Sequence, residues 1–250
     1  MKAIKIIAAC GTTLALVALA IACTKTTGKE VAKEDLNFNN KTLVQVYDAT
    51  VNSTSTHVFI DGAQVTGSAL TYGTVFPATA YAFQVQPGLR GFSIRSTASG
   101  TTQAPIIFSE NMDVKKNYTI FMYDTTTAAK QLTVENKIEI PSDTTARVKF
   151  ANFAWKSGAS APAVDIFSKL RNENVFANIN PTQVTEYIPY AAAVSDSLIV
   201  RQAGTMIALD TAVFNFTRKR SYTLVYRGRA AYNEAGGATF PRLLSSFVNY

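Results

Sequence analysis

The sequence predicts an all-β protein built from two tandem β-sandwich domains. Three observations lead to this prediction. The chain after residue 40 is rich in Thr, Val, Ile, Tyr and Phe, which favour strands, and glycine and proline separate its apolar segments. The same part of the chain lacks the apolar stripes of period 3.6 that are typical of amphipathic helices. Finally, four segments recur in the same order at offsets of 104 to 108 residues.

The recurring segments define the two predicted domains. The matching pairs are 42–49 with 146–153, 58–59 with 166–167, 81–95 with 187–201, and 114–123 with 218–227. Each copy is about 100 residues long, which is the usual size of a β-sandwich domain. We therefore place the first domain at residues 41–141 and the second at 145–250, with a turn-forming boundary between them.

Alternation within the copies predicts which face of each strand is buried. In RVKFANF, Val148 and Phe150 alternate with Lys149 and Ala151, and the segment FSIRS at 92–96 alternates in the same way. We therefore expect one face of each strand to pack in a core and the other to meet solvent.

The first 22 residues predict an export signal. Lys2 and Lys5 precede an uncharged segment at 6–22, and its continuous apolar part is shorter than the roughly 20 residues of a transmembrane helix. The segment ends in Ala20-Ile21-Ala22-Cys23, which resembles a bacterial lipobox. We therefore expect residues 1–22 to be removed and Cys23 to be acylated. The alternative is an ordinary signal peptide that leaves Cys23 as a free thiol.

Acylation would keep the mature protein on a membrane, because two or more acyl chains hold a protein there stably. The polar segment after Cys23 has no periodicity, so residues 23–40 are predicted to be the acylated cysteine and a flexible tether. Removal of two lysines with the signal lowers the formal net charge from +7 to +5. This mild basicity is compatible with an anionic glycan or lipid surface.

The second copy contains the residues that indicate a family. The segment ARVKFANFAWKSGASAPAVDIF at 146–167, followed by YIPY at 187–190 and SYTLVYRG at 221–228, resembles DUF4397, a domain of unknown function. The first copy keeps the related segment VFIDG at 58–62. The resemblance implies tandem immunoglobulin-like β-sandwiches on an exported protein, often a lipoprotein of Bacteroidota-type bacteria. It transfers no catalytic residue.

The resemblance also implies a place in the cell, namely export and lipid anchoring to the outer membrane. Outer-surface export in such bacteria tends to accompany an acidic run directly after the acylated cysteine. Here Glu30, Glu34 and Asp35 come later and are mixed with lysines. The periplasm-facing and cell-surface orientations therefore stay as alternatives.

Catalytic motifs are absent from the sequence. His57 is the only histidine, and a surface or strand-edge position explains it better than a catalytic base. A zinc site with two histidines is excluded, and no calcium-binding loop occurs. Phosphate-binding glycine loops and nucleophile-elbow motifs are also missing. We therefore predict that the protein is not an enzyme and binds no metal or cofactor.

Basic residues before two equivalent strands predict a possible binding surface. They are Lys115 and Lys116 in the first copy and Arg218, Lys219, Arg220 and Arg227 in the second. Such residues among tyrosines suit an anionic glycan or a lipid headgroup, and the alternative is a solvated hairpin rim. Although this pattern also occurs in nucleic-acid-binding proteins, an exported lipoprotein rarely meets nucleic acid, so we expect no such partner.

Trp155 is the second candidate for ligand contact. It is the only tryptophan and is predicted to lie in the loop AWKSGASAP at 154–162. An exposed indole there could stack on a sugar or anchor a protein partner, and the alternative is packing against its own domain.

These observations together predict a non-enzymatic, membrane-anchored envelope lipoprotein that acts as a binding, adhesion or assembly module. Its expected partners are the membrane, through the N-terminal lipid, and a glycan or envelope protein. One alternative is an accessory carbohydrate-binding or hydrolytic protein with an Asp/Glu site in the cleft between the domains. The other alternative is a structural spacer.

Overall fold

The computed structural model describes residues 38–250 except 79–80, 98–99, 101–102 and 230–239. These residues contain one short 3-10 helix, η1 (Phe38–Asn40), no α-helix, and strands joined by turns and loops. In this part of the chain no helix is long and apolar enough to cross a membrane. Phe38–Tyr250 form one compact unit. The predicted signal peptide, Cys23 and most of the tether lie outside the described residues.

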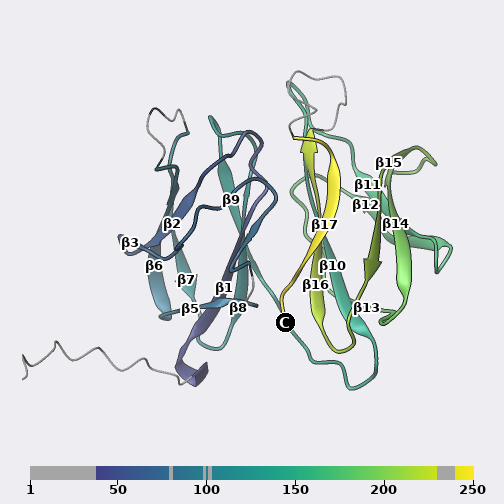
Figure 1. Cartoon of the computed structure of the whole chain (residues 1–250), viewed down its shortest axis with the longest axis horizontal. Helices are drawn as coiled ribbons and strands as arrows, with labels where there is room; N and C mark the ends of the chain where they lie inside the picture. Colours follow the sequence, from purple (N-terminus) through teal and green to yellow (C-terminus); the bar gives the residue numbers. More distant parts are fainter. Residues whose placement is uncertain (1–37, 79–80, 98–99, 101–102, 230–239) are drawn as a thin grey trace, which may run out of the picture. The chain divides into compact units, whose positions relative to one another are not determined.

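The first β-sandwich is made of an inner and an outer sheet (Figure 1). The inner sheet has the order β4-β1-β8-β9 with β5 also paired to β1, and the outer sheet has the order β3-β2-β6-β7. Its strands are β1 (Thr42–Asp48), β2 (His57–Ile60), β3 (Ala63–Gln64), β4 (Val75–Phe76), β5 (Phe83–Val85), β6 (Gly88–Arg95), β7 (Ile106–Met112), β8 (Asn117–Tyr123) and β9 (Lys130–Glu135). Between the sheets lies a core that includes Val44, Val46, Phe92, Ile94 and Ile120.

The second β-sandwich repeats this arrangement. Its inner sheet has the order β13-β10-β16-β17 and its outer sheet β12-β11-β14-β15. The strands are β10 (Ala146–Trp155), β11 (Val164–Ser168), β12 (Glu173–Ile179), β13 (Ile188–Tyr190), β14 (Ser195–Gln202), β15 (Ala208–Asn215), β16 (Ser221–Arg229) and β17 (Leu243–Val248). Its core includes Val148, Phe150, Ile166, Leu198 and Leu224. The predicted all-β fold with two β-sandwiches is confirmed.

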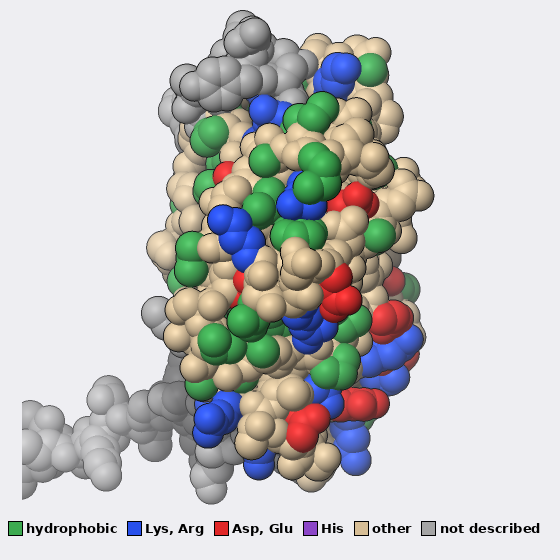
Figure 2. Space-filling view, turned by 90° about the vertical axis from the view of Figure 1, so that its right-hand side faces the viewer, with side chains coloured by type: hydrophobic (Ala, Val, Ile, Leu, Met, Phe, Trp, Pro, Cys, Tyr) green, Lys and Arg blue, Asp and Glu red, His purple; other side chains and the backbone are tan. Residues whose placement is uncertain are grey.

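The two sandwiches share their strand pairing as well as their strand order. In each inner sheet the first strand pairs in parallel with the strand that contains the recurring Tyr-Thr, β1 with β8 and β10 with β16. In each outer sheet an arginine stacks on a phenylalanine: Arg95 lies 4.3 Å from the Phe59 ring and Arg201 lies 3.6 Å from the Phe167 ring. Figure 2 faces the outer sheet of the second sandwich and shows hydrophobic and basic side chains scattered among other residues.

Apolar side chains of the two inner sheets pack against each other. A buried cluster joins Tyr47 and Phe121 of the first sandwich to Phe153, Val225 and Phe247 of the second. The rings of Phe121 and Phe153 are 4.8 Å apart, and those of Tyr47 and Phe247 are 5.3 Å apart and stacked. Aromatic pairs at such distances add to the free energy gained by burial. We call this contact the inter-sandwich interface.

A row of buried polar side chains crosses the same interface. The Gln45 side-chain amide donates to the Val248 carbonyl at 2.8 Å, and the Asn249 amide donates to Gln45 Oε1 at 2.8 Å. At the equivalent place, Lys149 Nζ donates to Asn136 Oδ1 at 2.5 Å. Because Lys149 follows Gln45 by 104 residues, the two bonds are related by the internal repeat.

An asparagine follows the last inner strand of each sandwich and completes the row. Asn136 donates to Thr119 Oγ1 at 2.9 Å in the first sandwich, and Thr223 Oγ1 donates to Asn249 at 2.6 Å in the second. Each asparagine thus bonds to its own sandwich and to the other one. A buried hydrogen-bond row of this kind fixes one register between two sheets, because any slip would leave polar groups unpaired.

This interface corrects the predicted exposure of one strand face. Lys149 and Ala151 were predicted to meet solvent, but Lys149 is 2% exposed and Ala151 is fully buried. The alternation itself is correct, since Val148 and Phe150 pack in the core of the second sandwich. The face that alternation assigned to solvent is covered by the other sandwich instead.

Burial of the Lys149 amine predicts a pH-dependent stability. Burial holds its pKa at about 7, below the ordinary 10.5, because the charged form loses its water. Between these values the unfolded chain binds a proton that the folded chain lacks, so the free energy of unfolding rises with pH. The slope from this group is up to about 1.4 kcal/mol per pH unit. Below about pH 7 both states are protonated and the contribution is constant.

The matched variant is Lys149→Gln, which places at this position the residue found at the equivalent Gln45. It can still donate to Asn136 but does not titrate. Urea unfolding between pH 6 and 10 should show a stability rise in the natural protein that the variant lacks. Equal pH slopes for the two proteins would contradict a neutral buried Lys149.

Candidate functional site

The candidate site is a groove where the two sandwiches meet, at the end where β8 and β10 finish. It has a volume of about 260 Å³. We call it the Trp155 groove. The described residues that line it are Tyr123, Asp124, Lys130, Phe153, Ala154, Trp155, Lys156, Ala159, Ser160, Ala161, Pro181 and Thr182. Both sandwiches contribute to it, so the inter-sandwich interface holds its two walls in place.

Asp124 organises the polar side of the groove. Its Oδ1 accepts hydrogen bonds from Trp155 Nε1 at 3.0 Å and from the backbone N–H of Thr125 at 2.9 Å. Its Oδ2 accepts from Lys130 Nζ at 2.8 Å, and this carboxylate raises the pKa of Lys130. Asp124 also has a φ of 75°, a left-handed conformation that aspartate tolerates better than most non-glycine residues.

Aromatic rings form the apolar side. Tyr123 and Phe153 lie 5.4 Å apart at the base, and the Arg229 guanidinium lies 5.4 Å from the Trp155 ring. Trp155 is half-buried and is the last residue of β10, not part of the following loop as predicted. Its indole packs against the first sandwich through Asp124. β10 is longer than predicted because it pairs with β16 as far as Arg229.

The prediction that Arg227 belongs to an exposed basic surface is wrong. It is 6% exposed, and its Nη1 donates to Ser245 Oγ at 2.6 Å. Its guanidinium lies 5.1 Å from the Tyr72 ring and 5.9 Å from the Tyr47 ring, both in the first sandwich. Arg227 therefore faces the other sandwich and not solvent, for the same reason as Lys149.

The other predicted basic residues lie in two equivalent turns. Lys115 and Lys116 precede β8 and are exposed, and Lys116 Nζ pairs with Glu135 at 2.6 Å. Arg218, Lys219 and Arg220 precede β16, and of these Arg220 is half-buried. Because these turns are at the beginning of β8 and β16, they lie away from the Trp155 groove, which is at the end of β8.

Three carboxylates away from the Trp155 groove are bonded to neighbours of their own. Asp48 is buried, which raises its pKa to about 6, and it accepts from Ser53 Oγ at 2.6 Å. Asp61 pairs with Arg90 at 2.9 Å, and Asp165 accepts from the backbone of Asn178 at 2.7 Å. Among the described residues that line the Trp155 groove, Asp124 is the one carboxylate.

His57 lies at a strand start and is bonded to neutral side chains. The His57 ring lies at the start of β2 within hydrogen-bond distance of Gln64 and Thr66. In the described part of the chain, no three His, Cys, Asp or Glu side chains come close enough together to hold a metal ion.

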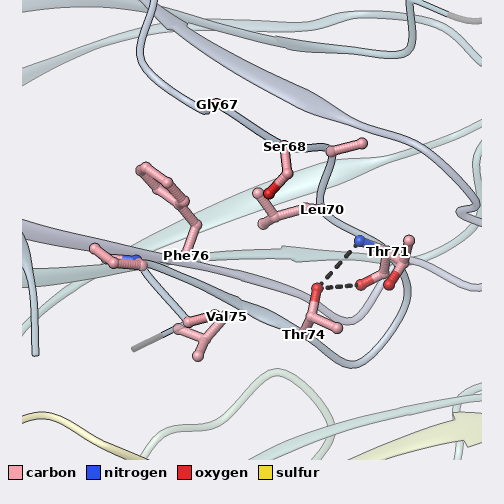
Figure 3. A pocket seen from close by; sticks show the side chains of 10 residues that line it. Gly67, Ser68, Leu70, Thr71, Thr74, Val75 and Phe76 are labelled. Carbon is pink, nitrogen blue, oxygen red and sulfur yellow. Dashed lines mark hydrogen bonds between the residues drawn. The ribbon is translucent and has the colours of Figure 1, made fainter. Parts of the chain in front are cut away.

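A larger hollow beside β4 is a weaker candidate. It has a volume of about 510 Å³ and is lined by residues 67–71 and 74–78, none of them charged. Figure 3 shows that Thr74 and Thr71 bond to each other: Thr74 Oγ1 donates to the Thr71 carbonyl at 2.8 Å and accepts from its N–H at 3.1 Å. Because these polar groups satisfy each other, fewer remain to orient a ligand.

The Trp155 groove can bind a ligand that offers both apolar and hydroxyl surfaces. Its rings provide a stacking face, and its carboxylate, ammonium and hydroxyl groups provide donors and acceptors. Trp155 could be selected from the sequence, whereas Asp124 and Lys130 could not. Asp124 falls outside the recurring segments, so only the packing of the two sandwiches brings it to the indole.

Gly73 lies close to Arg227, at the end of the inter-sandwich interface that also contains the Trp155 groove. Gly73 has a φ of +80°, and a Cβ placed on it would collide with the Arg227 guanidinium. Gly73→Ala should therefore lower the free energy of unfolding by about 2 kcal/mol, through backbone strain and displacement of the arginine. Gly67→Ala is the control, because a Cβ there meets nothing within 4 Å. Chemical denaturation in which the two variants lose equal stability would contradict the packing of Arg227.

Two solved structures are similar to this chain. A family CBM26 module, CBMbc of Eubacterium rectale Amy13K in complex with maltoheptaose, shows 10% identity over 82% of this chain and 96% of that one, with a TM-score of 0.26. A family 41 carbohydrate-binding module from streptococcal virulence factors, from work on alpha-glucan recognition, shows 11% identity over 74% and 93%, with a TM-score of 0.23. Likenesses of this strength carry no information on what this chain binds.

A search of curated proteins finds no match. A match to a protein family is found at residues 42–166, from the start of β1 into β11. This region contains the whole first sandwich and the first strand of the second, and it amounts to half of the chain. The chain therefore belongs to the DUF4397 family, a domain of unknown function.

Proposed function

We propose that the protein is a non-enzymatic binding module of the bacterial cell envelope, anchored through acylated Cys23, which holds a glycan in the Trp155 groove. The observation that carries this proposal is the groove itself. Rings and hydrogen-bonding groups from both sandwiches converge there, and the inter-sandwich interface keeps them in place before any ligand arrives. Preorganisation of this kind lowers the entropic cost of binding.

The two sandwiches are, in this proposal, tandem copies of the DUF4397 domain in a lipoprotein of Bacteroidota type. Their common strand order, their parallel β1–β8 and β10–β16 pairs and the recurring Arg-Phe stacks support this reading. The duplication explains why a ligand groove lies between them, since neither copy alone contains both Asp124 and Trp155.

A glycan fits the groove better than a folded protein partner. A volume of about 260 Å³ receives a short segment of ligand and not a large surface. The half-exposed indole offers a flat face, while Lys156, Ser160 and Thr182 line the groove with polar groups. Sugars combine apolar ring faces with hydroxyls, which is the chemistry that such a lining matches.

Fluorescence provides a direct test, because Trp155 is the only tryptophan. Glycans that bind in a glycan screen should shift or quench its emission. Trp155→Ala should weaken their binding at least tenfold in calorimetric titration, and Asp124→Asn should weaken it less. Ile107→Ala, on the exposed outer sheet of the first sandwich, is the control and should leave binding unchanged.

Two outcomes would contradict the groove assignment. One is glycan binding that Trp155→Ala leaves intact. The other is the absence of glycan binding together with capture of an envelope protein, which would make the module an adhesion or assembly factor.

The lipid anchor is tested separately, since Cys23 lies outside the described residues. The natural protein should incorporate labelled fatty acid and enter the detergent phase in phase partition, whereas Cys23→Ala should do neither and remain aqueous. Equal partition of the two proteins would contradict acylation at Cys23. Protease treatment of intact cells then distinguishes a cell-surface from a periplasm-facing orientation.

A further inference from the structure

We infer that the end of the described unit where β1 begins is a membrane-facing surface that binds anionic lipid headgroups. We call it the basal surface and define it by Val114, Lys115, Lys116, Val194, Arg218 and Lys219. The inference rests on the proposed lipid anchor, because an acylated Cys23 would keep this end of the protein near a bilayer. It adds a second, electrostatic contact with that membrane.

The position of the two basic turns follows from the backbone. The N–H of Lys115 donates to the Lys41 carbonyl at 2.9 Å, directly before β1. The N–H of Lys219 donates to the Thr145 carbonyl at 2.9 Å, directly before β10. Each basic turn therefore lies beside the beginning of the first strand of its sandwich. Figure 1 shows η1, the start of β1 and the C-terminus at the lower end of the described unit.

Contacts between the sandwiches place both turns at the same end. Arg220, next to Lys219, stacks over Tyr81 of the first sandwich at 4.8 Å and over Tyr250 at 5.8 Å. Tyr81 is 44% and Tyr250 37% exposed. Tyrosine has an apolar ring and a polar tip, which suits the boundary between headgroups and acyl chains.

The basal surface has more basic than acidic side chains. Lys115, Arg218 and Lys219 are exposed and form no ion pair with any described residue. Three acidic side chains lie nearby and reduce this excess: Glu135 pairs with Lys116 at 2.6 Å, while Asp113 and Asp143 accept hydrogen bonds from the neutral Asn111 and Thr145, so their negative charges are not neutralised by these bonds. Free cations next to an anionic bilayer attract it at about 1 kcal/mol each.

Exposed apolar side chains accompany these cations, Val114 in the first basic turn and Val194 directly before β14. Val114 is 47% and Val194 39% exposed. Arg218 lines an open hollow of about 490 Å³ together with Ala193, Asn215, Phe216 and Thr217. The hollow gives a headgroup phosphate room beside the guanidinium. Cations with exposed apolar neighbours are typical of surfaces that rest at the membrane interface.

The backbone at the two lysines determines which substitution tests the basal surface. Lys115 and Lys219 have φ values of 63° and 60°. Left-handed positions favour glycine and asparagine, and any other residue costs about 1 kcal/mol there. Local structure therefore disfavours lysine at both positions, although both sandwiches have it. Asparagine is therefore the substitution that removes each charge without adding backbone strain.

The test uses the mature chain, residues 23–250, with Cys23→Ala, so that no acyl chain contributes to binding. It is sedimented with vesicles of phosphatidylcholine alone or mixed with an equal amount of phosphatidylglycerol. Binding should require the anionic lipid and weaken as salt is added. Lys115→Asn combined with Lys219→Asn should reduce the partition coefficient by roughly 25-fold, about fivefold for each charge.

The matched control removes two charges elsewhere, through Arg95→Gln and Arg201→Gln on the outer sheets. It should lower vesicle binding about twofold or less. Thermal unfolding adds a second readout: the asparagine pair should be at least as stable as the natural chain, because asparagine tolerates the left-handed conformation. If the asparagine pair is as stable as expected, a loss of vesicle binding is not due to unfolding.

Three outcomes would overturn the inference: equal binding to both vesicle types, an asparagine pair that loses no more binding than the control, or binding to an anionic polysaccharide but not to vesicles. These outcomes are distinguishable from failure of the proposed function, since acylation of Cys23 and glycan binding at Trp155 are measured on other proteins and with other readouts. Vesicle binding by a protein that is not acylated in cells would support the basal surface and contradict the proposed lipid anchor.

Discussion

The structure depends on burial of two sheet faces against each other. The inner sheets would each expose aromatic rings if they stood alone, and together they cover Tyr47, Phe121, Phe153 and Phe247. Apolar packing supplies the free energy, but it does not specify a register. The register comes from the row of Gln45, Lys149, Asn136 and Asn249, whose hydrogen bonds are satisfied in one arrangement only. Lys149 makes this row costly, because its charged form is disfavoured by burial.

The same interface gives the protein two different ends. Strands β1, β8, β10 and β16 begin at the basal surface, and β8 and β10 finish at the Trp155 groove. The groove needs Asp124 from one sandwich and Trp155 from the other, so it exists only while the interface is intact. The basal surface likewise takes one basic turn from each sandwich. In the proposed function, a lipid-anchored end and a ligand-binding end are thus separated by the length of the strands, and the paired sandwiches keep that separation constant.

Much of the fold could be predicted from the sequence, because the strands follow from local patterns of apolar and polar residues. The period-2 alternation located the strands, and the offsets of 104 to 108 residues matched β1 with β10 and β8 with β16. The placement of Lys149 and Arg227 could not be predicted in this way, since alternation shows which residues share a face but not what covers that face. A signal was present in RVKFANFAW, where Ala151 and Phe153 share the face of Lys149 and indicate burial on both sides. Asp124 had no such signal, because a groove between repeats depends on how they pack.

The central claim is that the two sandwiches form one cooperative body. Differential scanning calorimetry of the mature chain tests it most directly. We expect one transition whose calorimetric enthalpy equals its van't Hoff enthalpy, because unfolding either sandwich exposes the aromatic face and the polar row of the other. Two resolved transitions, or a calorimetric enthalpy about twice the van't Hoff value, would contradict it. Either result would show that the sandwiches unfold independently and that the interface does not hold the groove in place.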